Sequence, residues 1–154
     1  MKLSRNLSLS EVVKSNTATR RGINNNPSAA HMTNLIKIAN NIFQPIRDHF
    51  DKPIFVSSGY RSESLNDMIG GSKTSQHSKG EALDLDNDSI EYPTNRMIFD
   101  YIKDHLDFDQ LIYEFGNDES PSWVHVSFTD SRPNRKQVLK AIKENGRTKY
   151  ITYQ

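Results

Sequence analysis

The chain has no cysteine among its 154 residues. Disulfides, thiolate metal sites and a cysteine nucleophile are therefore excluded, and the redox compartment stays undetermined. Neither sign of charge dominates, because 20 basic and 19 acidic residues leave a formal net charge of +1. A strong electrostatic attraction to nucleic acid or to an anionic membrane surface is therefore not expected.

Long apolar runs are also missing. Residues 1–6 lead into polar sequence, so that neither a signal peptide nor a membrane-spanning helix is predicted. Internal repeats and low-complexity segments are absent, and 34% of the residues are hydrophobic. We expect one compact domain over residues 1–154 that buries a single core, is monomeric and does not associate stably with membranes.

Four segments have the pattern of helices. Apolar residues at helical spacing and polar residues at the ends predict them over residues 8–13, 28–49, 62–69 and 94–105. Ser8 and Glu11 have the spacing of a capping box, and Pro45 is expected to kink the second helix.

Four other segments have the pattern of strands, over residues 54–57, 82–85, 110–115 and 123–128. The first is expected to be buried, whereas the others alternate between an apolar face and a more polar one. Residues 136–153 suggest a hairpin that turns at residues 144–146. The predicted fold class is α+β, with an antiparallel sheet that helices cover on one side and that carries a site on the other.

The most informative stretch is Ser75 to Asp84, where His77 and Asp84 stand seven residues apart around a glycine turn. His125 follows much later, on the polar face of the strand 123–128. Two imidazoles and one carboxylate leave the fourth position of a zinc ion open for water, which is typical of catalytic sites. The sequence thus points to a zinc hydrolase, with Asp86 as the competitor of Asp84.

Several fragments occur in an order and spacing that resemble the zinc D-Ala-D-Ala carboxypeptidase family, peptidoglycan peptidases with a hedgehog-like fold. They are residues 57–62, 65–66, 70–71, 75–77, 80, 84 and 123–126. The chain is most similar to the small phage-type members, which include L-Ala-D-Glu endopeptidases, because residues 9–11 and 17–20 also match. The resemblance extends from about residue 7 to about residue 128.

By this resemblance His77, Asp84 and His125 fall on the zinc-ligand positions, and Zn²⁺ is the implied cofactor. Arg61 falls on a position that binds substrate and stabilises the developing oxyanion, for which its planar fork is suited. Ser75 matches a position that binds substrate or orients the site.

Gln76 is expected to support the site rather than to act in catalysis. Trp123 either lines the cleft or packs beside the metal. His31, His49 and His105 lie in helical or polar contexts without a matching motif, and we expect them to be ordinary surface or packing residues.

The pattern departs from the family at Ser122, where many relatives have an acidic residue three positions before the last histidine ligand. A serine does not serve as a general base at neutral pH without its own activator. If residues 110–115 and 123–128 form a hairpin, Glu114 lies near His125 on the same face, and it is the best substitute. Asp118 and Glu119 in the connecting loop remain alternatives.

The predicted function is that of a zinc metallopeptidase acting on the peptide stems of bacterial peptidoglycan. Removal of a terminal D-Ala and cleavage of an internal L-Ala-D-Glu type bond fit the motifs equally well. We expect a phage endolysin that a holin releases from the host cytoplasm to the cell wall, a cell-wall remodelling enzyme or a virion-associated peptidase. The alternative is a zinc-containing cell-wall binding or virion module that has lost catalysis.

Overall fold

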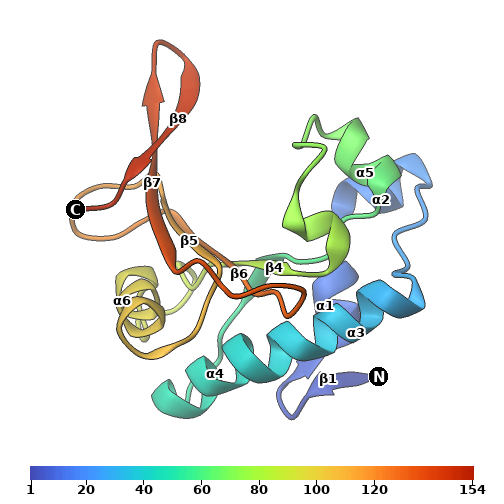
Figure 1. Cartoon of the computed structure of the whole chain (residues 1–154), viewed down its shortest axis with the longest axis horizontal. Coiled ribbons are helices and arrows are strands. Elements are labelled where there is room, and N and C mark those ends of the chain that lie inside the picture. Colours follow the sequence, from blue (N-terminus) through green and yellow to red (C-terminus); the bar gives the residue numbers. More distant parts are fainter.

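A computed structural model describes all residues from 1 to 154 (Figure 1). The strands are β1 Lys2–Ser4, β2 Leu7–Ser8, β3 Val56–Ser58, β4 Ala82–Leu85, β5 Gln110–Glu114, β6 Trp123–Ser127, β7 Gln137–Glu144 and β8 Arg147–Thr152. The helices are α1 Leu9–Val13, α2 Asn16–Arg21, α3 Ala29–Ile38, α4 Gln44–Phe50, α5 Glu63–Met68 and α6 Asn95–His105, with a π-helical segment η1 Ala39–Phe43 and a 3₁₀ helix η2 Gln76–Lys79. Not one of these helices combines the length and the apolar character that crossing a membrane requires.

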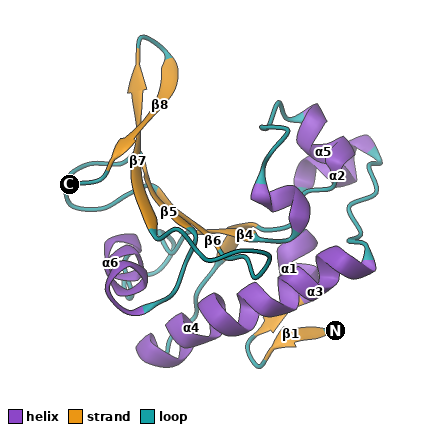
Figure 2. Cartoon of the chain, viewed as in Figure 1, coloured by secondary structure: helices purple, strands orange, loops and turns teal.

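Six strands form the main sheet, in the order β3-β4-β6-β5-β7-β8. Helices α3, α4 and α6 lie on one side of it, and the β7–β8 hairpin rises at one end (Figure 2). Leu83, Leu85, Val126 and Tyr113 point from the strands into the core, where they meet the apolar side of the helices. The apolar face predicted for these strands therefore packs against the helices, and the fold class is α+β.

The sheet is mixed rather than wholly antiparallel, because β7 pairs with β5 in parallel register, with Glu114 opposite Ala141. Strand β6 already has a neighbour on each edge, β4 and β5. The chain therefore turns back through residues 128–136 and adds β7 to the free edge of β5. The β7–β8 hairpin itself is antiparallel as expected, and it turns at Asn145 and Gly146, which both have positive φ.

The long helix predicted over residues 28–49 is interrupted instead of only kinked. The π-helical segment η1 ends just before Pro45, which lies in the first turn of α4. Proline lacks the N–H that would bond to the carbonyl four residues earlier and its ring crowds that carbonyl, so a wider turn precedes it. The other three predicted helices begin where expected, with Ser8, Ser62 and Thr94 as N-caps, whereas α2 was not predicted.

Two strand predictions need correction. The first strand lies at Val56–Ser58, two residues later than predicted, and it is not buried, because it forms the edge of the sheet with β4 as its sole partner. Alternation along the strand predicted over residues 110–115 would put Phe115 on the core face with Leu111 and Tyr113, but β5 ends at Glu114. The positive φ of Phe115, 56°, turns its ring to the opposite face, where it packs against Trp123.

Candidate metal centre

His77 is held in place by the turn that carries it and by a hydrogen bond from its ring to the backbone. It lies in η2, whose C-cap Gly80 has φ 74° and packs so closely that a Cβ would come within 2.5 Å of the His31 carbonyl oxygen. Its Nδ1 lies 2.7 Å from the carbonyl oxygen of Gly59. Because a carbonyl only accepts hydrogen bonds, Nδ1 carries the proton and the lone pair of Nε2 is free for a ligand.

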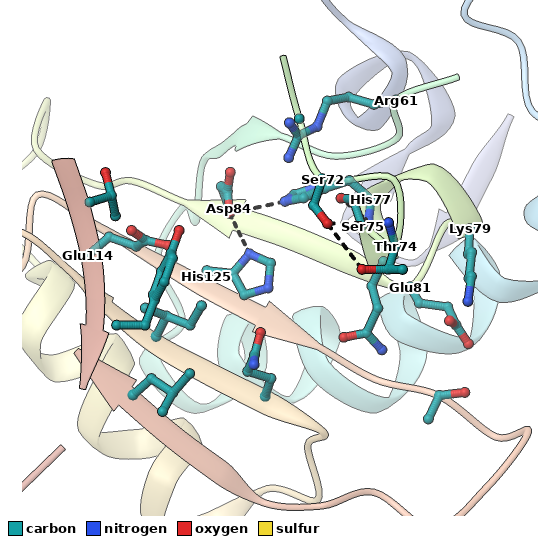
Figure 3. A pocket seen from close by; sticks show the side chains of 18 of the residues that line it. Arg61, Ser72, Thr74, Ser75, His77, Lys79, Glu81, Asp84, Glu114 and His125 are labelled. Atoms are coloured by element: carbon teal, nitrogen blue, oxygen red, sulfur yellow. Dashed lines mark hydrogen bonds and ion pairs between the residues drawn. The ribbon is translucent and has the colours of Figure 1, made fainter. Parts of the chain in front are cut away.

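Asp84 and His125 are directly opposite each other in the pairing of β4 with β6. Side chains at opposed positions share one face of the sheet, here the face away from the core helices. Asp84 Oδ1 lies 3.0 Å from His125 Nδ1 and 3.3 Å from His77 Nε2 (Figure 3). The three groups offer ligand atoms that all lie within 4.8 Å of one another.

The chemistry of this donor set fits zinc. Burial lowers the pKa of His77 against the opposing charge of Asp84, which favours the neutral imidazole that a metal requires. Burial works to raise the pKa of Asp84, but the two imidazoles beside its carboxylate hold that pKa well below its usual range. Two neutral nitrogens and a carboxylate are what tetrahedral zinc takes in catalytic sites, with one position left for water.

Glu114 lies on the same face, at the end of β5. It pairs with Trp123 in the β5–β6 hairpin, while Ile112 pairs with His125, so the predicted register is present. Its side chain is buried and lines the same cleft as the three metal-binding candidates. Burial raises the pKa of Glu114 to about 7, with the charge of His125 opposing the rise and that of Asp84 adding to it.

Arg61 enters the cleft from the turn that follows β3. Its backbone N–H donates to the His77 carbonyl at 3.1 Å, which ties the turn to η2. The side chain of Asn25 holds the same turn, because it donates to the Tyr60 carbonyl and accepts from the Ser62 N–H. The Nε of Arg61 is buried without a hydrogen-bond partner, and burial lowers the pKa of Arg61 against the charge of Asp84. A guanidinium left with a free donor in a cleft is ready to bind an oxygen of a ligand.

Three further predicted residues lie in this cleft. Ser75 is the N-cap of η2, where its Oγ accepts from the His77 N–H at 3.2 Å. Gln76 donates to Asp109 at 3.2 Å and makes no bond to a metal-binding candidate. Trp123 both lines the cleft and packs against Phe115, at 5.5 Å between ring centroids.

The alternative acids lie elsewhere. Asp86 accepts from the backbone N–H of Asp88 and from Asn95, which turns it away from the histidines. Asp118 and Glu119 are exposed loop residues outside the cleft. Ser122 is also absent from the cleft lining, and its backbone N–H donates to the Glu114 carbonyl.

The remaining histidines lie apart from the site. His31 Nδ1 lies 3.0 Å from the hydroxyl of Tyr60, and His49 stacks on Tyr101. His105 also packs against Tyr101, at 5.1 Å between ring centroids. These three side chains make packing and hydrogen-bond contacts away from the metal-binding candidates.

The cleft has a volume of about 920 Å³, and sequence reasoning missed both of its ends. Leu139, Thr148 and Tyr150 of the β7–β8 hairpin line one part of it, and Glu81, Arg132 and Arg135 line another. No local pattern in the sequence marks these residues, because their place depends on the parallel pairing of β7 with β5 and on the path of the loop before it.

Comparison with known proteins gives one family. The family model described as Peptidase M15 matches residues 5–127 of this chain. A search of curated proteins finds no match. The matched residues include α1, the Arg61 turn, η2 and strands β3 to β6, and they leave out β7 and β8.

Proposed function

The chain belongs to the peptidase M15 family of zinc-dependent peptidases, and from this premise we propose that it hydrolyses an internal peptide bond in the stems of bacterial peptidoglycan. We base this on the convergence in one cleft of His77, Asp84 and His125 with Glu114 and Arg61. A metal site that served only to stabilise the fold would not need a buried acid and an unpaired guanidinium beside it.

The shape of the cleft favours an endopeptidase over a carboxypeptidase. Glu114 lies on one side of Asp84 and His125, and Lys79 and Glu81 lie on the other (Figure 3). The cleft lining continues in both of these directions from the metal-binding candidates. A polypeptide substrate would thus have room on both sides of the scissile bond, as cleavage of an L-Ala-D-Glu type bond requires.

His77, Asp84 and His125 would hold zinc, which supplies a Lewis acid for the scissile carbonyl and acidifies water. Glu114 would accept a proton from the attacking water and return it to the departing amine. A carboxylate whose pKa lies near 7 is matched to both transfers at neutral pH.

Arg61 would donate to the carbonyl oxygen of the substrate as negative charge develops on it. Removing one preorganised donor of this kind typically lowers kcat about 100- to 1,000-fold. Ser75 would position η2 at the edge of the substrate site, and Trp123 would form an apolar wall.

The test is digestion of purified peptidoglycan by zinc-loaded protein, with mass analysis of the fragments and of the new amino termini. A new internal amino terminus is the expected result, and it names the bond. Release of free D-Ala alone would instead establish a carboxypeptidase. Loss of cleavage in His125→Ala, with Arg20→Gln as an exposed control, ties the activity to the site.

Ser122 favours one other candidate, a zinc-containing wall-binding or virion module without catalysis. At position 122 many relatives have an acidic residue that this chain lacks. The non-catalytic module is supported if zinc-loaded protein binds several wall types and cleaves none. For the active enzyme, we propose a phage endolysin or a wall-remodelling enzyme as the biological setting.

A further inference from the structure

The proposed reaction leaves one end of the cleft unused. Gln76, Lys79, Glu81, Arg132 and Arg135 line this end, which we call the polar end. Lys79 and Glu81 lie on the side of the metal-binding candidates opposite Glu114 (Figure 3). Arg132 and Arg135 come from the loop between β6 and β7, outside residues 5–127 that match the family.

The two arginines are held rigidly by one carboxylate. Asp109 is fully buried and accepts two hydrogen bonds from Arg132, at 2.7 and 3.0 Å. It accepts from the Arg135 side chain at 3.1 and 2.9 Å. One negative charge thus faces two positive ones, and both guanidiniums are about half exposed, 44% and 50%. The result is a fixed pair of forks with donors left over and one uncompensated positive charge.

Glu81 adds a negatively charged side chain to the polar end. Only 7% of the residue is exposed, yet its carboxylate makes no hydrogen bond and no ion pair. Its charge still acts on Arg132, whose pKa is raised first by the hydrogen bond to Asp109 and also by the charges of Asp109 and Glu81. The carboxylate oxygens are not among the buried polar atoms that lack a partner, so they open to the cleft and are free to accept hydrogen bonds from a cationic group of a ligand.

We propose that the polar end binds a free amino-acid group of the substrate, in which one carbon carries an ammonium and a carboxylate. Arg132 and Arg135 receive the carboxylate, and Glu81 receives the ammonium. This inference rests on the proposed function and narrows its substrate: a stem whose third residue is a diamino dicarboxylic acid offers such a group. A stem with lysine there offers the ammonium alone.

The kinetic experiment uses stem pentapeptides L-Ala-γ-D-Glu-X-D-Ala-D-Ala, which contain both candidate bonds. X is meso-diaminopimelate, the same residue with its free carboxylate amidated, or lysine. Because a hydrogen bond to a charged group is worth roughly 1.5–3 kcal/mol, we expect KM for the first peptide to be about 10- to 100-fold lower than for the other two, with kcat little changed. The amide comparison leaves the protein untouched, so it does not depend on how a variant folds.

Two variants test which side chain binds the carboxylate of the substrate and which binds its ammonium. Arg132→Gln is expected to raise KM about tenfold for the peptide with the free carboxylate and to leave the amidated one unchanged. Glu81→Gln is expected to raise KM for all three peptides, since each carries the ammonium. The exposed residues Arg20 and Glu91, changed to glutamine, are the matched controls. A purely structural role of Arg132 would change KM for the free and amidated peptides alike, which would overturn the assignment.

Binding separates this inference from the proposed function. Calorimetry with zinc-loaded Glu114→Gln protein measures the affinity of each of the three peptides in the absence of turnover. If the diaminopimelate peptide binds more tightly than the other two but the unaltered protein cleaves none of them, the proposed peptidase activity is rejected and the proposed binding site at the polar end is kept. Cleavage with equal KM values and equal affinities would reject the subsite and keep the peptidase. Absence of both would reject both.

Discussion

Replacement of Glu114 by glutamine should stabilise the metal-free protein at pH 8 while it strongly slows hydrolysis. Burial holds the proton on Glu114 in the folded state, where its pKa is about 7 instead of 4.5. Each pKa unit is worth about 1.4 kcal/mol, so the ionised carboxylate lowers the free energy of unfolding by roughly 3 kcal/mol above pH 7. Glutamine has nearly the same shape and carries no charge, so it is free of this penalty.

The sign follows from the direction of the shift. Below pH 4.5 the carboxyl is protonated in the folded and unfolded states, and the penalty is absent. It grows between about pH 4.5 and 7, because the unfolded chain loses the proton first, and it is complete above pH 7. The difference in unfolding free energy between variant and parent should therefore rise over this interval and then stay level.

The assays are urea unfolding and thermal unfolding of both metal-free proteins from pH 4.5 to 8, together with peptidoglycan hydrolysis by the zinc-loaded proteins. At pH 8 the variant should melt roughly 6–12 °C higher, since about 1 kcal/mol shifts a chain of this size by about 2–4 °C. Turnover should fall about 100- to 10,000-fold, the usual contribution of a general base. A stability difference that does not change with pH would refute the buried, proton-holding carboxyl, and near-normal turnover with zinc bound would remove Glu114 from catalysis.

Three more predictions concern the supports of the site. Asp109→Asn should lower the free energy of unfolding by about 1.5–3 kcal/mol in urea unfolding at pH 7, because it weakens the charge-assisted hydrogen bonds to two half-exposed arginines. Burial works to raise the pKa of Asp109, but the hydrogen bonds of Arg132 and Arg135 hold that pKa well below its usual range. This contribution is therefore present above about pH 4 and is lost as the pH falls. Gly80→Ala should cost about 1–2 kcal/mol from its positive φ, with more from the clash with His31, and a zinc titration should show weakened binding. Arg61→Ala should keep its zinc in metal analysis but lose about 100- to 1,000-fold in kcat, and unchanged kcat would exclude Arg61 from oxyanion stabilisation.

The part of the site that lies on short strands could be predicted, because alternation along a strand is a local property. It placed Asp84, His125 and Glu114 each on the more polar face of its strand, and the hairpin expected between residues 110–115 and 123–128 put Glu114 near His125. The glycine at position 80 likewise marked the turn that carries His77. The family resemblance added the expected role of Arg61, for which no periodicity exists.

The remainder depends on contacts between segments far apart in the chain. Which free edge receives β7 is decided by the strands already paired, and a local pattern does not encode that choice. For the same reason, Arg132 and Tyr150 could not be assigned to the cleft from the sequence. Phe115 illustrates a smaller limit, since one residue with positive φ reverses the face that alternation predicts.

The β7–β8 hairpin forms a wall of the cleft whose tip is less stable than the core of the protein. Every residue of β8 is exposed, so separating the tip from the sheet uncovers little apolar surface. Its base is anchored, because Tyr153 bonds to the Val138 carbonyl and packs on Phe99. The tip can therefore open and close by sub-global fluctuations while the core stays folded, so amide exchange there should be fast in the free protein and slower when a long substrate spans the cleft.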